Sequence, residues 1–229
     1  YLAGGLTTTG HSPLDQAQAR FSDGTAPRWA ERVAELQPGE GARLGVAVHS
    51  VRAVPRGDLA LVGQVARDRG LPLHVHLSEQ PGENLACQGF YGCSPTELLA
   101  SEGLLTPSTT AVHATHLSAN DVRLLGGAGS TACFCPTTER DLADGIGPAR
   151  ALHDAGAAIS LGSDQHAVID PFEEVRGVEM HERLDSLERG RFSPPELLAM
   201  GSSSGYRSLG WGEGGILAAG HLADLVAVR

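Results

Sequence analysis

The sequence contains no lysine. All 17 basic residues are therefore arginines, and 27 acidic residues bring the formal net charge to −10. Schiff-base chemistry and Walker-type phosphate binding both need a lysine amine, so the sequence excludes them. The arginines form no basic stripe of the kind that a nucleic-acid-binding surface carries. We therefore expect no nucleic-acid partner.

Long apolar runs and paired cysteines are also missing. No apolar run approaches the roughly 20 residues that a membrane crossing needs, and the first residues lack the basic-then-apolar layout of a signal peptide. This predicts a soluble, cytoplasmic protein with no membrane partner. The four cysteines, Cys87, Cys93, Cys133 and Cys135, show no CxxC spacing, which indicates reduced thiols. The sequence assigns no role to Cys87 or Cys93.

The residues that are present suffice for one folded domain. A chain of 229 residues with 41% hydrophobic and 19% charged side chains can bury a substantial core. The chain opens at Tyr1, has no methionine before Met180 and ends at Arg229 inside an expected strand, 223–229. We therefore expect it to be part of a longer protein.

Helical and strand patterns alternate along most of the chain. Residues 1–26 show no sustained period and predict a long loop, whose role the sequence leaves open. Ser-x-x-acid starts at Ser94 and Ser118 mark two helices by their capping chemistry. The expected helices are 27–37, 57–70, 94–105, 118–129, 147–156 and 171–184, and the expected strands are 42–50, 71–77, 109–115, 131–136 and 157–164.

Apolar strands that alternate with helices predict an α/β fold with a parallel sheet, either open and doubly wound or closed into a barrel. All five expected strands end in polar or reactive side chains, and only in a barrel do all strand ends face one mouth. The sequence therefore favours a (β/α)8 TIM-type barrel. Five strands cannot close such a barrel, so about three must lie outside this sequence.

The strand at 71–77 carries the most informative polar residues. His74 and His76 share one face of the strand, and His76 lies roughly 6 to 7 Å nearer the mouth. Glu79 follows in a loop, where its carboxylate can turn back toward the same site. The pattern is also typical of two histidines packed inside a sheet, so this segment alone leaves both interpretations open.

Other strand ends add possible metal ligands. The last strand ends in Asp164, and a carboxylate together with imidazoles is a natural ligand set for a divalent ion such as Zn²⁺. Asp170 is a better cap than Asp164 for the next helix, which leaves Asp164 for the mouth. His113 and His116 end another strand, although a buried structural histidine explains either one alone.

Taken in order, the segments "HVHLSEQ", "VHATH", "CPTTERDLADGI" and "LGSDQH" resemble strands five to eight of the metal-dependent amidohydrolase superfamily, in its deaminase branch. The "HSVRAV" element beginning at His49 is similar to the pattern of its formimidoylglutamate deiminases, the iminohydrolases of histidine degradation. The resemblance covers about residues 10–229. It implies that strands 4 to 8 of the barrel occupy residues 1–215 and that residues 216–229 begin the return into a flanking β-sandwich.

The resemblance also implies a role for each site residue. His76 and Asp164 would bind one divalent metal, with Zn²⁺ favoured over Fe²⁺ or Mn²⁺, and Asp164 would also act as the general base. Glu79 would transfer protons to the imine nitrogen, and His113 would stabilise the charge that develops at the attacked carbon. The substrate would be a small carboxylated molecule, N-formimidoyl-L-glutamate, which is hydrolysed to N-formyl-L-glutamate and ammonia. Its binding residues would be His49, Arg52, Glu139 and His166.

The sequence departs from the family in one respect, because it lacks the first strand, whose His-x-His pair completes the metal site. We therefore expect this chain on its own to have lost metal binding. The family resemblance implies a homodimer.

Two alternatives stay open: another deaminase or chlorohydrolase of the superfamily that acts on a purine, pyrimidine or triazine, and a non-catalytic binding barrel. An Arg52 side chain that points into the mouth would favour a carboxylated substrate.

Overall fold

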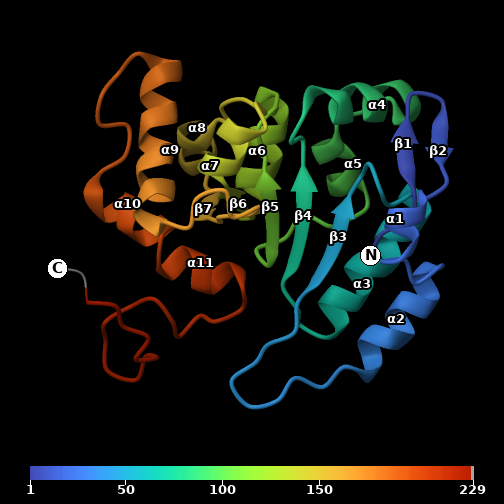
Figure 1. The fold of residues 1–229 in the computed structure, drawn as a ribbon, viewed down its shortest axis with the longest axis horizontal. Helices are drawn as coiled ribbons and strands as arrows, with labels where there is room; N and C mark the ends of the chain where they lie inside the picture. The colour runs from blue at the N-terminus through green and yellow to red at the C-terminus, as the bar shows by residue number, and fades with distance from the viewer. Residues whose placement is uncertain (228–229) are drawn as a thin grey trace.

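The computed structural model describes residues 1–227, and a five-stranded parallel sheet forms its centre (Figure 1). The strands lie in the sheet in the same order as in the sequence. Each falls inside a strand that the sequence predicts, so the parallel sheet is confirmed. The strands are β3 (Val46–Ser50), β4 (Leu73–Leu77), β5 (Thr109–His113), β6 (Thr131–Phe134) and β7 (Ala158–Leu161).

Helices connect consecutive strands, as parallel pairing requires. None of the helices formed by residues 1–227 is long and apolar enough to span a membrane. Five helices, α1 (Gln16–Ala19), α4, α7, α10 and α11, are absent from the sequence prediction. The helices are α2 (Ala26–Glu35), α3 (Arg56–Asp68), α4 (Pro81–Tyr91), α5 (Pro95–Ser101), α6 (Ala119–Gly127), α7 (Pro136–Asp141), α8 (Ala149–Asp154), α9 (Pro171–Ser186), α10 (Pro194–Met200) and α11 (Ser203–Ser208).

Three helix starts follow from capping chemistry. Ser94 caps α5 and Ser118 caps α6, each in a complete capping box with the acidic residue three positions later. The carboxylate of Asp170 accepts hydrogen bonds from the Phe172 and Glu173 amides at the start of α9. The predicted caps are therefore confirmed, and Asp164 is not needed as a cap for α9.

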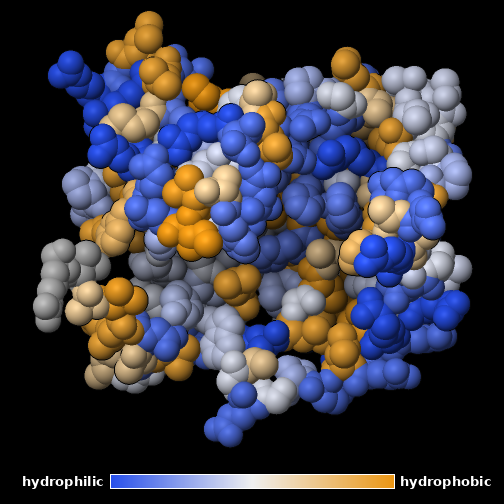
Figure 2. All heavy atoms as spheres, viewed as in Figure 1, coloured by the Kyte–Doolittle hydropathy of each residue, from blue (hydrophilic) through white to orange (hydrophobic). Residues whose placement is uncertain are grey.

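The two faces of the sheet are covered differently. Val48, Val75 and Leu77 point to the face that packs against the helices, and each is at most 1% exposed. On the opposite face of the same strands, His49 is exposed and His76 is half-buried. In a closed barrel the helices cover the outer face and the other face lines the interior. The sheet is thus part of an α/β barrel. Figure 2 shows hydrophilic and hydrophobic residues mixed on the viewed side.

The N-terminal segment differs from the predicted loop. It forms a short hairpin of β1 (Gly5–Thr7) and β2 (Gly10–Ser12), followed by a single-turn helix, α1 (Gln16–Ala19). The hairpin is held by contacts to distant residues: the Leu6 amide donates to the Arg52 carbonyl at 2.6 Å, and His11 Nε2 lies 2.7 Å from the Tyr91 hydroxyl. Strands of three residues are too short to show a period in the sequence, which explains the difference.

The C-terminal segment also differs in part. Residues 223–227, where the sequence predicts a strand, form none, and residues 228–229 lie outside the described residues. The Asp224 carboxylate accepts a hydrogen bond from the Tyr206 hydroxyl at 2.9 Å, which ties this segment to α11. The assignment of residues 216–229 to a second domain stays a prediction.

Gly126 and Gly127 in α6 provide a test of the packing between α6 and α8. A Cβ atom on Gly126 would lie 2.3 Å from the Ala155 carbonyl oxygen, whereas a Cβ on Gly127 would meet nothing within 4 Å. We expect Gly126→Ala to lower the free energy of unfolding by about 1–3 kcal/mol, because the added methyl group overpacks the interface. Gly127→Ala should raise it by about 0.5–1 kcal/mol through helix propensity. Urea unfolding measures the free energy of unfolding of each variant. Equal values for the two variants would contradict the close contact between Gly126 and Ala155.

Candidate active site

The predicted site residues gather at the carboxyl ends of the strands. Parallel strands place these ends along one edge of the sheet, so side chains from distant parts of the sequence meet there. Seven of the eight predicted residues lie near one another through the contacts described below. They are His49 on β3 and Arg52 after it, His76 on β4 and Glu79 after it, His113 at the end of β5, Glu139 on α7, and Asp164 after β7.

Three imidazole rings lie in a row across the strand ends. The rings of His49 and His76 have centroids 5.0 Å apart, and the rings of His76 and His113 are stacked at 5.7 Å. His76 Nδ1 lies 2.7 Å from the backbone carbonyl oxygen of His49. Because a carbonyl can only accept, Nδ1 carries the proton and donates it. The other nitrogen of His76, Nε2, is therefore the unprotonated one.

Carboxylates flank the His113 ring at both nitrogens. Nε2 is 3.8 Å from Glu79 Oε1 and 3.8 Å from Asp164 Oδ2, and Nδ1 is 3.4 Å from Glu139 Oε1. Burial lowers the pKa of His113, but the bond to Glu139 and the charges of the three carboxylates outweigh it and raise the pKa above its ordinary value. This ring brings His76 and Asp164 to one place, since one stacks on it and the other faces its Nε2.

The backbone at the site is strained. His113 has a φ of 68° and Asp164 a φ of 43°, and Ser78 and His166 in the neighbouring loops also have positive φ. Non-glycine residues adopt this left-handed region at a cost of about 1–3 kcal/mol each, and such residues cluster at functional sites. The strained backbone at His113 and Asp164 thus lowers the stability of the fold while it sets the directions of these two predicted catalytic side chains.

Arg52 contacts two carboxylates and lines a cavity. Its Nη2 lies 2.6 Å from Glu79 Oε2, and its Nε lies 3.4 Å from Glu83 Oε2. Together with His49 and His76, Arg52 lines a cavity of about 730 Å³ between β3 and the N-terminal segment. Burial and the charges of His76 and Arg52 lower the pKa of His49 to about 4, so His49 is neutral in this cavity at pH 7. The guanidinium of Arg52 is thus a permanent positive charge facing the cavity.

Glu139 departs from its predicted role in substrate binding. Its side chain is 1% exposed and lies on the side of His113 away from Asp164, where Oε1 also accepts a hydrogen bond from the Cys135 amide at 2.7 Å. A buried carboxylate with these partners orients His113 and does not line the cavity. The ligand atoms of His113, Glu139 and Cys135 lie within 4.8 Å of one another. The sequence did not single out Cys135 for the site, although its spacing of four residues from Glu139 was a usable signal.

His166 is the one predicted site residue that the structure does not bring into contact with the others. It is exposed, and its backbone amide donates to the Ser163 carbonyl at 2.9 Å. Among residues 1–227, no hydrogen bond or ion pair joins its side chain to the cluster. The role of His166 in substrate binding stays a prediction.

Glu83 is a site residue that the sequence analysis missed. It lies in the first turn of α4, is 2% exposed, and has Arg52 as its ion-pair partner. Burial raises the pKa of Glu83 to about 7, and the charge of Arg52 opposes the rise. The only signal in the sequence was its spacing of four residues from Glu79, which alone does not distinguish a buried carboxylate from one on a solvated helix face.

Two histidines of the site make the second hydrogen bond that is typical of metal-binding histidines, although the group of three close donor atoms found within residues 1–227 is His113, Cys135 and Glu139. A histidine ligand normally donates its second ring nitrogen to a carbonyl or carboxylate, which fixes the tautomer and the ring orientation. His76 does this through Nδ1 to the His49 carbonyl, and His113 does so through Nδ1 to Glu139. The Nε2 atom of His76 and the carboxylate of Asp164 are the pair that would hold the ion, with His113 Nε2 beside them. This part of the predicted site stays a prediction.

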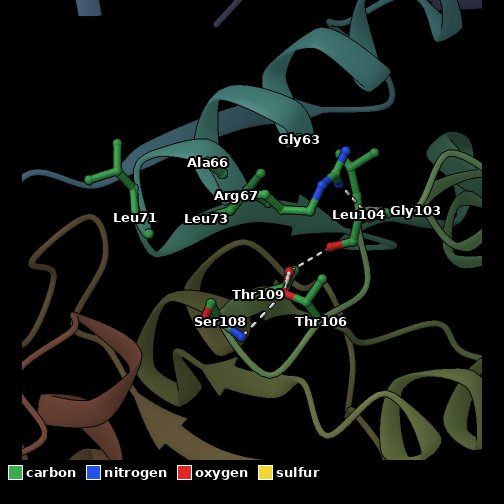
Figure 3. A pocket seen from close by; sticks show the side chains of 11 residues that line it. Gly63, Ala66, Arg67, Leu71, Leu73, Gly103, Leu104, Thr106, Ser108 and Thr109 are labelled. Atoms are coloured by element: carbon green, nitrogen blue, oxygen red, sulfur yellow. Dashed lines mark hydrogen bonds between the residues drawn. The ribbon is translucent and has the colours of Figure 1, made fainter. Parts of the chain in front are cut away.

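A second pocket lies at the opposite end of the sheet (Figure 3). It has a volume of about 260 Å³ and is lined near the amino ends of β4 and β5. Its polar groups pair with one another: Thr109 Oγ1 donates to the Leu104 carbonyl at 2.5 Å, and Arg67 donates to the Gly103 carbonyl at 2.9 Å. In barrel enzymes the amino ends of the strands serve stability, and these pairings agree with that role.

Comparison with known proteins identifies relatives of the chain. The model of the Amidohydrolase family matches residues 5–229. The chain is 31% identical to a formimidoylglutamate deiminase from Pseudomonas aeruginosa over 228 residues, which are 96% of this chain and 50% of the relative. It is also 31% identical to a 5-methylthioadenosine/S-adenosylhomocysteine deaminase from Nitratidesulfovibrio vulgaris over 190 residues, which are 82% and 43% of the two chains.

Solved structures give the same result for the fold. An amidohydrolase from Brucella melitensis matches with a TM-score of 0.84 and 31% identity over 93% of this chain and 49% of its own. An adenosine deaminase from Xanthomonas campestris, solved with bound zinc, matches with a TM-score of 0.81 and 25% identity over 86% and 47%. The chain thus spans about half the length of the relatives it matches.

The contact between His113 and Glu139 is tested by Glu139→Gln. We expect this substitution to lower the pKa of His113, because it removes the carboxylate that opposes the effect of burial. A raised pKa means that protonated His113 stabilises the fold below the unfolded-state pKa and that this contribution is lost as the pH rises through the folded-state pKa. NMR titration of the histidine rings measures the shift. Glu174→Gln, a buried carboxylate bonded to Thr137, is the control and should leave His113 unchanged. If both variants titrate like the wild type, Glu139 does not act on His113.

Proposed function

The chain belongs to the amidohydrolase family, and we propose that it carries the catalytic residues of a metal-dependent deaminase whose substrate is the linear amidine N-formimidoyl-L-glutamate. The observation that carries this choice of substrate is Arg52, whose guanidinium lines the cavity beside His49 and His76. An arginine fork suits a carboxylate, and the proposed substrate has two carboxylates. The similarity to a formimidoylglutamate deiminase over 96% of the chain supports the same substrate.

The reaction adds water to the amidine carbon and breaks its bond to the terminal nitrogen, which gives N-formyl-L-glutamate and ammonia. When bound by His76 and Asp164, a divalent metal such as Zn²⁺ would lower the pKa of water to about 7 and so provide a nucleophile at neutral pH. Asp164 accepts a proton from the attacking water and returns it to the leaving nitrogen. The Glu79 carboxylate takes the second proton from the hydroxyl group that the carbon has gained and passes it to the same nitrogen, so that the carbonyl forms as ammonia leaves. His113, whose Nε2 faces both carboxylates, stabilises the charge that develops at the attacked carbon.

A second substrate class is favoured by a specific observation. The Nitratidesulfovibrio vulgaris relative is also 31% identical, and the two substrates in its name are adenosine derivatives, of which 5-methylthioadenosine has no carboxylate. The pairing of Arg52 with Glu79 would suit a substrate without a carboxylate near Arg52, because the arginine already has a partner. However, Glu79 is itself a proposed catalytic group. Its ion pair with Arg52 therefore places Arg52 inside the site, where it can meet a substrate carboxylate.

The proposal predicts ammonia release from N-formimidoyl-L-glutamate by the full-length protein. Asp164→Asn should lower kcat/KM by about 10³-fold, because it removes the general base. Asp185→Asn, an exposed aspartate on α9, is the matched control and should retain full activity. A coupled assay for ammonia measures both variants. Turnover of 5-methylthioadenosine with none of the amidine would replace the substrate, and turnover of neither by protein with bound metal would support a non-catalytic barrel.

The metal requirement is a separate prediction. Dialysis of the full-length protein against a chelator should lower turnover at least about 10²-fold, and added Zn²⁺ should restore it. His76→Asn should lower the metal content per chain, because it removes the proposed ligand on β4. His153→Asn, a histidine on α8 that is 35% exposed, is the control. Elemental analysis measures the content, and an unchanged content in His76→Asn would contradict the ligand assignment.

A further inference from the structure

Glu83 is a buried carboxylate without an assigned role in the reaction. It is 2% exposed, and neither of its carboxylate oxygens has a hydrogen-bond partner within residues 1–227. Leaving a carboxylate buried and unpaired costs several kcal/mol unless a positive charge lies nearby. The only such charge within 4 Å among the described residues is the Arg52 guanidinium, with Nε 3.4 Å from Glu83 Oε2. The charge of Arg52 opposes the effect of burial, but the pKa of Glu83 still lies at about 7, so Glu83 is partly ionised at neutral pH.

Arg52 is shared between two carboxylates of different exposure. Its Nη2 contacts Glu79, whose side chain is 12% exposed, and its Nε faces Glu83, whose side chain is 0% exposed. No hydrogen bond or ion pair of the third guanidinium nitrogen, Nη1, is found within residues 1–227. Nε thus lies beside the buried Glu83 in an ion pair without a hydrogen bond, and Nη1 is the terminal nitrogen without a partner among these residues. Arg52 also lines the cavity beside β3.

We propose that Glu83 is a positioning residue that holds the Nε side of Arg52, so that the terminal guanidinium nitrogens pass from Glu79 to a substrate carboxylate when the substrate enters. This inference rests on the proposed function, because it needs a carboxylated substrate. Glu79, once released from Arg52, is free to turn fully toward His113 Nε2, 3.8 Å from its other oxygen, and to carry a proton from the reacting hydroxyl group to the leaving nitrogen. Binding of the correct substrate would in this way free the proton-transfer group.

The charges around Arg52 support this exchange. A substrate carboxylate replaces the Glu79 carboxylate at Nη2, so the guanidinium keeps two carboxyl neighbours before and after binding. Glu83 stays at Nε throughout, and its place in the first turn of α4 puts it at the positive end of an 11-residue helix. Without the Glu83 carboxylate, Arg52 would have Glu79 as its only charged partner, and the substrate would compete for Arg52 against a tighter pair.

The kinetic test uses Glu83→Gln and Glu83→Asp in the full-length protein with N-formimidoyl-L-glutamate as substrate. Glu83→Gln should raise KM about 10-fold and change kcat by less than about 3-fold, because it disturbs binding of the carboxylate and not the reacting atoms. Glu83→Asp should recover part of the loss. Glu179→Gln, another buried carboxylate that is remote from Arg52, controls for general destabilisation and should leave KM unchanged. A wild-type KM in Glu83→Gln overturns the proposal.

A double-mutant cycle shows whether Glu83 acts through Arg52. In an Arg52→Gln background, Glu83→Gln should cause no further rise in KM, because the group that it positions is gone. Additive losses would overturn the positioning role. The cycle also serves if Glu83→Gln folds poorly, because Glu83→Asp can replace it.

A measurement without turnover separates this inference from the proposed function. The NMR signal of the Arg52 Nε–H group should shift and exchange faster with water in Glu83→Gln, and it should stay unchanged in Glu179→Gln. Calorimetric titration with the product, N-formyl-L-glutamate, should show binding that weakens about 10-fold in Glu83→Gln. If the wild type neither turns over the amidine nor binds the product, the proposed function fails, and the Nε–H signal still decides whether Glu83 holds Arg52. An unchanged signal overturns the inference.

Discussion

The His113 ring is the point at which the polar residues of the site meet. It stacks on His76, faces Glu79 and Asp164 with Nε2, and contacts Glu139 with Nδ1. Its φ of 68° shows that the chain adopts an unfavourable backbone conformation at this residue, and the flanking carboxylates compensate through charge. Because Glu139 contacts Nδ1 of His113, Nε2 is the ring nitrogen that remains for other groups of the site. The acid, the base and the metal-binding groups are thereby ordered around one nitrogen.

The parallel sheet is what brings these residues together. His76, His113 and Asp164 lie far apart in the sequence, but they lie on β4, at the end of β5 and after β7, and these strands point the same way in one sheet. Helices pack against the face of that sheet that carries Val48 and Val75, and His49 and His76 lie on the opposite face, which lines the interior of a barrel. The sheet thus separates residues that hold the fold from residues that carry chemistry, one face for each.

This separation explains what the sequence could predict. The strands, the caps at Ser94 and Ser118 and the grouping of polar residues at strand ends follow from period and capping, which are local properties. Other features depend on distant partners and leave no local pattern. The hairpin at 5–12 is held by Arg52 and Tyr91, Glu139 orients His113 across the sheet, and Glu83 is buried only because Arg52 lies opposite. For these residues the sequence identifies the side chain but does not predict which distant residue it contacts.

In the proposed mechanism Arg52 would link substrate recognition to catalysis, because one guanidinium lies between the carboxyl groups of Glu79 and Glu83. The chain has a net charge of −10 and no lysine, so an anionic substrate cannot be attracted by the protein as a whole and must find a local cation. That cation is paired with Glu79, a group that the reaction needs free. A substrate that lacks a carboxylate has nothing to exchange for Glu79, and it would leave the proton-transfer group bound to Arg52. Selectivity would then arise in the catalytic step itself, because only a substrate that displaces Glu79 makes the proton available.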